Sequence, residues 1–253
     1  MIWQRCHGAQ QIKLVEGVLY RLVESQEEIA TNGYVDTLEE QAVLEDLLDQ
    51  AKPAYGDLNH QGNLDDYHYL LKTPFRYPPL PWGSRFGRRH ELGILYGGRG
   101  IEVTLAESAF YRFIFWFSID AEPIKASIKS QHQLFSVEYN SQSGVQLHAP
   151  EFSAEQSLLT HVTNYHACQN LGSAMREAGV EAFEYTSARD PERGICVGLF
   201  NLAPLATKEP KSKANWFCEV SARRVAFRES ESSDVIAFAV DDFLVDGEFP
   251  RPA

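Results

Sequence analysis

The sequence predicts an α+β protein in which a β-sheet dominates and a few helices pack on it. Residues 103–117 contain neither Gly nor Pro and are nearly all apolar apart from Glu107 and Arg112, which is typical of a buried helix. Residues 166–178 have a helical pattern that stops at Gly179. Much of the remaining C-terminal half consists of short apolar runs separated by polar turns, which indicates strands. Helices combined with such strands are typical of the α+β class.

The N-terminal third contains one predicted strand, one predicted helix and a long loop. Residues 17–25 alternate in the manner of a short strand. A helix begins at Asp36 or Thr37, either of which can accept a hydrogen bond from a free backbone N–H, and Pro53 ends it. Residues 54–82 combine many helix and strand breakers with many aromatic side chains, so we expect a packed loop. The other expected strands are 93–97, 123–139, 145–149, 182–187, 195–201, 216–220, 224–228 and 235–240.

Length and composition set the broad class. The chain has 253 residues, of which 44% are hydrophobic and 12% aromatic, enough for a sizeable core and too apolar for a disordered chain. We expect a single domain over 1–253, with an extension or insertion at about 30–82 and a C-terminal part that adds to the sheet. The net charge of −12 argues against direct nucleic-acid binding, since phosphate backbones are repelled by an acidic surface.

Several other functions are excluded by missing patterns. No apolar stretch is long enough to cross a bilayer, and the N-terminus does not resemble a secretory signal. The four cysteines form no CxxC pair and the eight histidines show no paired-ligand spacing, so we expect neither a disulfide framework nor a metal site. The segment Gly97–Gly100 lacks the spacing of a phosphate-binding P-loop. A reducing cytoplasm is the expected location.

Three segments carry candidate functional residues. The loop Gly83–His90 contains two glycines and three arginines, which suits phosphate binding but is also typical of a solvated basic loop. Glu107 is a carboxylate in an apolar helix, where burial of its charge costs free energy unless the group is paired or functional. The structural alternative is a contact of Glu107 with Tyr111 or Arg112. Ser187 follows a predicted strand, where serine is most often a turn cap, and no surrounding motif supports a nucleophilic serine.

Taken together, these segments resemble the RES domain, which is named for an Arg, a Glu and a Ser. Arg85 in Gly-Ser-Arg-Phe-Gly is similar to the family arginine, and Tyr96 in Ile-Leu-Tyr-Gly is similar to its strand tyrosine. Glu107 in Thr-Leu-Ala-Glu and Ser187 in Tyr-Thr-Ser-Ala-Arg-Asp are similar to the glutamate and the serine. Arg21 resembles the arginine of the family's first strand. The likeness covers roughly residues 17–202 and suggests a longer branch of the family.

The resemblance implies a fold and an activity. The expected fold is an ADP-ribosyltransferase-like split β-sheet core with flanking helices, and the expected activity is directed at NAD, which is a substrate rather than a resident cofactor. Members of the family act as toxins of bacterial toxin–antitoxin pairs, so the resemblance implies an Xre-like antitoxin as a protein partner. Some members deplete NAD by hydrolysis or phosphorolysis, and at least one type transfers ADP-ribose to a protein. A homo-oligomer is also possible.

The chemistry of NAD cleavage assigns hypothetical roles to the matched residues. Loss of nicotinamide leaves an oxocarbenium-like ribose, whose positive charge Glu107 would stabilise. Arg21 and Arg85 would hold the pyrophosphate, Tyr96 would stack on a ring of NAD, and Ser187 would orient the ribose or the carboxamide. Glu107, Arg85 and Ser187 are therefore the predicted catalytic residues. Two alternatives stay open: a protein ADP-ribosyltransferase that uses the same site, and a non-catalytic protein-interaction module.

Overall fold

The computed structural model describes residues 1–25, 37–50, 66–77, 79–120 and 125–251. The helices are α1 (Ile2–Arg5), α2 (Leu38–Gln50), α3 (Tyr69–Lys72), α4 (Ile101–Phe117), α5 (Gln156–Leu159) and α6 (His166–Glu177). The strands are β1 (Lys13–Glu24), β2 (Leu95–Gly98), β3 (Ile128–Gln146), β4 (Ala182–Thr186), β5 (Ile195–Leu199), β6 (Ser212–Val220), β7 (Arg224–Glu229) and β8 (Ile236–Ala239). Short 3₁₀ helices lie at Gly8–Gln11, Thr73–Phe75, Pro150–Glu155 and Val240–Phe243.

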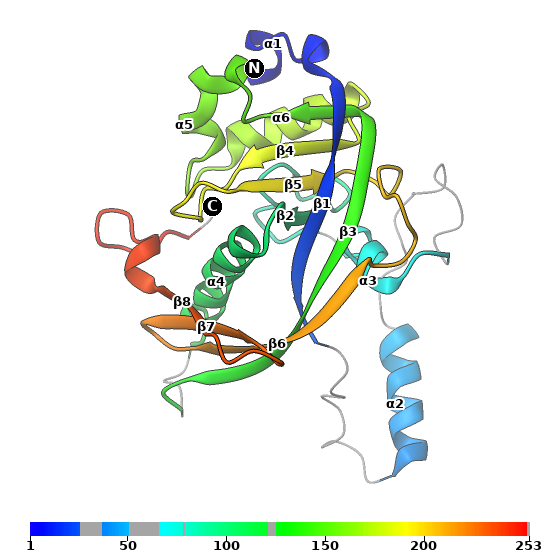
Figure 1. Ribbon diagram of the computed structural model, residues 1–253, viewed down its shortest axis with the longest axis vertical. Helices are drawn as coiled ribbons and strands as arrows, with labels where there is room; N and C mark the ends of the chain where they lie inside the picture. The colour runs from blue at the N-terminus through cyan, green and yellow to red at the C-terminus, as the bar shows by residue number, and fades with distance from the viewer. Residues whose placement is uncertain (26–36, 51–65, 78, 121–124, 252–253) are drawn as a thin grey trace.

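The eight strands form one mixed sheet that divides at β3. Its order is β1-β2-β5-β4-β3-β6-β7-β8, and β1 also pairs with β3 along most of its length. The first part of β3, Ile128–Ser136, pairs with β6, whereas its last residues, Gly144–Gln146, pair in parallel with β4. The strands therefore separate into two groups, β4-β5-β2 and β6-β7-β8, on either side of the long β1–β3 pair (Figure 1). The predicted α+β fold with a split sheet and flanking helices is confirmed.

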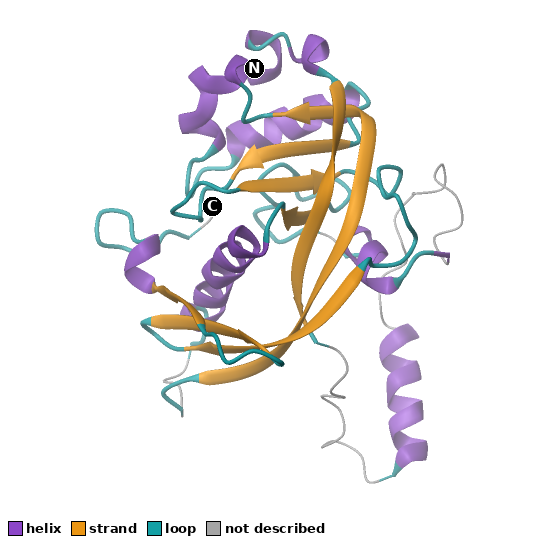
Figure 2. Ribbon diagram, in the orientation of Figure 1, coloured by secondary structure: helices purple, strands orange, loops and turns teal. Residues whose placement is uncertain are grey.

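Helix α4 lies across the division between the two groups of strands. It packs against β1, against β2 and β5 of one group, and against β6 and β7 of the other (Figure 2). Its buried side chains, among them Phe110 and Phe113, share an apolar cluster with Trp216 and Phe227 of β6 and β7. Because the core fixes this face of α4, the side chains on its other face have defined positions between the two groups of strands.

Most expected elements appear, and the differences have local causes. The predictions of 123–139 and 145–149 as separate runs were wrong, because β3 is continuous from Ile128 to Gln146. Gly144 permits this continuity: a Cβ at this position would lie 2.0 Å from the side chain of Val15 on β1. The expected loop 54–82 contains a short helix, α3, within its described part.

The predicted helix near residue 37 is present as α2, and Thr37, one of its two expected caps, forms a capping hydrogen bond. The Thr37 hydroxyl oxygen accepts a hydrogen bond from the backbone N–H of Glu40 at 3.1 Å. Asp36 and Pro53 lie outside the described residues. The interaction of Thr37 satisfies one of the free N–H groups at the helix start, as the sequence predicted.

Gly172 allows α6 to approach the backbone of residues Gly83–His90, called the arginine-containing loop. A Cβ at this position would lie 1.8 Å from the carbonyl oxygen of Phe86, the residue next to Arg85. We expect Gly172→Ala to push α6 and this loop apart and to lower the free energy of unfolding by about 2 kcal/mol or more. Urea denaturation measures this loss, with Glu177→Ala at the exposed end of the same helix as the control. A Gly172→Ala protein as stable as the parent would show that the close approach is not needed.

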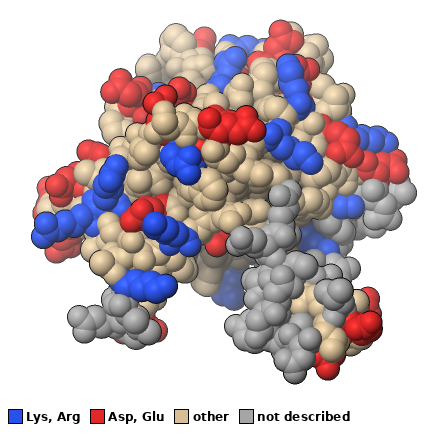
Figure 3. Space-filling view, turned by 60° about the horizontal axis from the view of Figure 1, so that its bottom comes forward, with Lys and Arg blue, Asp and Glu red and all other residues tan. Residues whose placement is uncertain are grey.

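The surface carries both signs of charge. Lys and Arg side chains are interspersed with Asp and Glu side chains over the face shown in Figure 3. In the described part of the chain, no helix has the length and apolar character needed to cross a membrane. The mixed surface contains no continuous basic band on the face shown, in agreement with the acidic composition.

Candidate active site

A cavity of about 580 Å³ opens between α4, β1, β2 and the loop that precedes β2. One wall is formed by α4, which presents side chains one and two turns apart, and the opposite walls come from strand ends and the loop. The polar side chains of its lining are Arg21, Glu24, Thr73, Ser84, Arg85, Thr104, Glu107, Ser108, Arg112 and His132, and the aromatic ones are Tyr77, Trp82, Tyr96, Tyr111 and Tyr185. Four of the five sequence-predicted site residues therefore line one cavity, namely Arg21, Arg85, Tyr96 and Glu107.

Glu107 stands half-buried on the cavity wall, in the middle of α4. Its Oε1 accepts a hydrogen bond from the Ser187 hydroxyl at 2.5 Å, and the Cys196 thiol lies 3.7 Å from the same oxygen. Both partners come from the β4–β5 hairpin, about 80 residues further along the chain. Arg112, one of the two expected structural partners of Glu107, instead forms an ion pair with Glu24. Ser187, which does not line the cavity, thus holds the Glu107 carboxylate, which does.

Ser187 lies behind Glu107 rather than on the cavity wall. It is fully buried at the end of β4, and its Oγ accepts hydrogen bonds from the backbone N–H groups of Arg189, at 3.0 Å, and Asp190, at 2.9 Å. With both N–H groups pointing at the oxygen, the hydroxyl hydrogen is free to point at Glu107. The hydroxyl group of Ser187 therefore has two roles: it caps the turn after β4, and it donates a hydrogen bond to Glu107 of the site.

Arg85 is buried, with 7% of its surface exposed, and its guanidinium binds a neighbouring loop. Its Nη1 donates to the carbonyl oxygens of Leu159, at 3.2 Å, and His161, at 2.9 Å, and the group lies 4.7 Å from the centre of the Tyr165 ring. Burial alone lowers the pKa of Arg85, but the nearby Tyr165 and Glu107 raise it above the usual value overall. The interpretation of 83–90 as a solvated basic loop is therefore wrong for Arg85.

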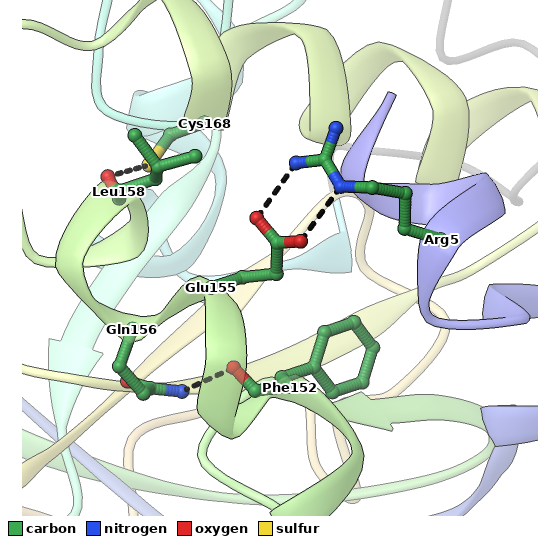
Figure 4. A network of polar contacts seen from close by, with 6 residues as sticks. All are labelled: Arg5, Phe152, Glu155, Gln156, Leu158 and Cys168. Atoms are coloured by element: carbon green, nitrogen blue, oxygen red, sulfur yellow. Dashed lines mark hydrogen bonds and ion pairs between the residues drawn. The ribbon is translucent and has the colours of Figure 1, made fainter.

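The segment whose carbonyl oxygens accept hydrogen bonds from Arg85, Leu159–His161, is held in place by contacts on two sides. Arg5 of α1 donates two hydrogen bonds, both 2.7 Å long, to the Glu155 carboxylate, which lies just before α5 (Figure 4). The Cys168 thiol of α6 donates to the carbonyl oxygen of Leu158 at 3.5 Å (Figure 4). From the other side, Arg189 donates to the carbonyl oxygen of Val162. This support gives Arg85 a rigid set of acceptors, so its position at the cavity wall is well defined.

Tyr96 connects the arginine-containing loop to β2. Its hydroxyl shares a hydrogen bond with the Ser84 hydroxyl at 3.0 Å and accepts one from the N–H of Phe86 at 3.0 Å, which places these contacts on both sides of Arg85. Burial raises the pKa of the Tyr96 hydroxyl. The backbone carbonyl of Tyr96 accepts from Nη1 of Arg21 at 2.9 Å. One tyrosine thereby positions both predicted phosphate-binding arginines.

The polar cavity residues that were not predicted from the sequence include Arg112 and His132. Arg112 follows Thr104 and Ser108 at intervals of four residues, a spacing that places all three on one face of a helix. This spacing could have predicted that Arg112 lies near the site, since Glu107 was already assigned to the same helix. His132 lies on β3 opposite Glu24 of β1, a long-range pairing that no local pattern reveals.

The split sheet and its cavity define the class of this protein as an α+β protein with an ADP-ribosyltransferase-like fold. The family model of the RES domain matches residues 62–221, more than half of the chain, and the chain therefore belongs to the RES domain family. The match includes Arg85, Tyr96, Glu107 and Ser187, and begins after Arg21. It starts and ends later in the chain than the expected range of 17–202. A search of curated proteins found no match.

Proposed function

We propose that this protein cleaves NAD at the bond between nicotinamide and ribose and thereby acts as the toxin of a toxin–antitoxin pair. The observation that carries this proposal is the Glu107 carboxylate, which borders a cavity shared with Arg21 and Arg85 and is held from behind by the buried Ser187. A fixed negative charge beside cationic groups matches the charge distribution of NAD, in which a sugar that becomes positive lies next to a negative pyrophosphate.

In the proposed reaction, the bond between C1′ of the ribose and the pyridinium nitrogen breaks. Its electron pair goes to the nitrogen, so nicotinamide leaves as a neutral molecule and the ribose acquires oxocarbenium character. Glu107 stabilises that positive charge, and because the protein holds the carboxylate in place beforehand, little reorganisation is needed during the reaction. A nucleophile then adds to C1′, and when the nucleophile is water it loses a proton to give ADP-ribose.

The other matched residues support this step in different ways. Ser187 positions the Glu107 carboxylate through its 2.5 Å hydrogen bond, a role that suits its complete burial better than contact with the substrate. Arg85 supplies positive charge beside Glu107, and Tyr96 keeps the arginine-containing loop in place while its ring borders the cavity. Arg21 is available for a phosphate group, a charge-assisted contact worth roughly 1.5–3 kcal/mol.

Membership of the RES domain family supports the biological part of the proposal, since RES-domain proteins are generally toxins paired with antitoxins. We propose an Xre-like antitoxin as the partner of this chain and NAD as its substrate, with no further cofactor needed for the bond cleavage described above. Growth arrest on expression, relieved by co-expression of such an antitoxin, is the expected behaviour in cells.

The proposal is tested by incubating purified protein with NAD and identifying the products with and without inorganic phosphate. We expect nicotinamide in both cases, with ADP-ribose as the second product of hydrolysis and a phosphorylated ADP-ribose as the second product of phosphorolysis. Nicotinamide release accompanied by ADP-ribose bound to protein would identify transfer to a protein instead. Intact NAD after prolonged incubation with folded protein would contradict the proposal and favour a non-catalytic interaction module.

A further inference from the structure

Arg112 occupies the end of the cavity that lies beyond Glu107 along α4. Thr104, Ser108 and Arg112 form one row on this helix, and all three border the cavity together with Glu107. Arg112 is five residues after Glu107, a separation of about 7.5 Å along the helix axis. Only 12% of its side chain is exposed, so the guanidinium is largely withdrawn from bulk solvent.

The charge of Arg112 is poorly balanced by its neighbours. Its Nη1 lies 3.4 Å from the carboxylate of Glu24, whose side chain is 65% exposed, and an ion pair of this length with an exposed partner contributes little. The guanidinium also lies over the Phe115 ring, 4.8 Å from its centre. Its Nε is buried and has no hydrogen-bond partner among the residues that the structure describes.

Two of the groups around Arg112, Cys218 and His132, are uncharged and do not compete with an anion for its charge. The Cys218 thiol is a weak hydrogen-bonding group, and burial raises its pKa to about 11, so it is neutral at pH 7. His132, on β3 beside the same end of the cavity, has its pKa lowered to about 4, mainly by burial and further by Arg112, and is also neutral. Arg21 lines the same cavity as Arg112, and burial lowers its pKa to about 10, which leaves it charged at pH 7.

We propose that Arg112 and Arg21 together form the subsite for the phosphate groups of the substrate. This inference rests on the proposed function, since it places the reacting ribose at Glu107 and the pyrophosphate of NAD further along α4. Two guanidinium groups in one cavity, one of them paired only with an exposed carboxylate, gain most from a ligand that carries two negative charges. Arg85 takes a smaller part in phosphate binding, because its Nη1 is already bound to two carbonyl oxygens.

Binding of ADP-ribose tests the subsite without any reaction. We expect Arg112→Gln to weaken the affinity measured by calorimetry about 10- to 100-fold, the range expected when a charge-assisted contact is lost. Glu24→Gln should leave the affinity equal or make it a few-fold tighter, since it removes a competing carboxylate. Arg228→Gln is the matched control, because Arg228 also lies over a phenylalanine ring, that of Phe217, but outside the cavity.

Two outcomes of the titration would overturn the proposal. The first is an unchanged affinity for ADP-ribose in a folded Arg112→Gln protein. The second is an equal loss in Arg112→Gln and Glu24→Gln, which would show that their ion pair only maintains the structure. Thermal unfolding of each variant identifies proteins that have lost their fold, and Arg112→Lys then serves as a second variant, since it keeps the charge and loses the bidentate geometry.

A comparison of two substrates separates this inference from the proposed function. NAD and nicotinamide riboside contain the same scissile bond, but the riboside has no pyrophosphate. We expect Arg112→Gln to lower kcat/KM about 10- to 100-fold for NAD and to leave the value for the riboside unchanged. Equal losses for both compounds would contradict the subsite. If the unaltered protein cleaves neither compound, the proposed function is wrong, and the ADP-ribose titration alone decides the subsite.

Discussion

Glu107→Gln is expected to lower the rate of NAD cleavage about 10³-fold while the affinity for NAD changes little. The substitution keeps the size of the side chain and an oxygen that can still accept the Ser187 hydrogen bond, but it removes the negative charge. Electrostatic stabilisation of a developing charge is commonly worth about 10²–10³ in rate, and a lone carboxylate facing an oxocarbenium ion belongs at the upper end of that range. Nicotinamide release measures the rate, and calorimetry measures the affinity.

A matched control for Glu107→Gln is Glu102→Gln, at the first turn of the same helix and outside the cavity. Glu102 is exposed, so this variant should cleave NAD at the rate of the unaltered protein. Undiminished cleavage by Glu107→Gln would remove this residue from the mechanism. A large loss of NAD affinity with an unchanged turnover number would give Glu107 a role in binding only.

Ser187→Ala is expected to affect both stability and rate. The substitution leaves two buried backbone N–H groups, those of Arg189 and Asp190, without their acceptor and removes the hydrogen bond to Glu107. Since each buried group left unsatisfied costs about 1–3 kcal/mol, we expect a loss of about 2–4 kcal/mol in the free energy of unfolding. The rate of NAD cleavage should fall at least about tenfold, because the carboxylate loses its fixed position.

Chemical denaturation and nicotinamide release measure the two effects of Ser187→Ala separately. Ser173→Ala is the control, because the Ser173 hydroxyl also donates to a glutamate, Glu91, but neither residue lines the cavity. We expect this control to lose at most about 1 kcal/mol and no activity. If Ser187→Ala retained full stability and full activity, neither the cap nor the link to Glu107 would be needed.

The parts of the fold that the sequence predicts are those with a local signature. Helix α4 was expected from an unbroken apolar run, and α6 from a helical pattern that ends at Gly179, whose φ of +77° suits a residue without a side chain. The paired strands β4 and β5 were expected from two apolar runs around a polar turn. The division of β3 into two runs was wrong, because the strand continues through Gly144, where the absence of a side chain accommodates Val15.

The arrangement of the site could not be predicted from the sequence to the same extent, because it depends on contacts between residues that are distant in the chain. Glu107 was predicted as a site residue because it is a carboxylate in an apolar helix. Its partner Ser187 is 80 residues away and contacts it only because α4 packs against β5. The binding of Arg85 to backbone carbonyls depends on the position of the loop after α5. Likewise, His132 reaches the cavity through the β1–β3 pairing, which requires the three-dimensional path of both strands.

The crystal structure of the Glu107→Gln protein with bound NAD tests the account most directly, because the variant should bind NAD without consuming it. We predict that C1′ of the nicotinamide ribose lies within about 4 Å of the residue 107 side chain and that the pyrophosphate contacts Arg21 and Arg112. NAD bound outside the cavity, or bound in it with the nicotinamide ribose at the Arg112 end, would contradict the account.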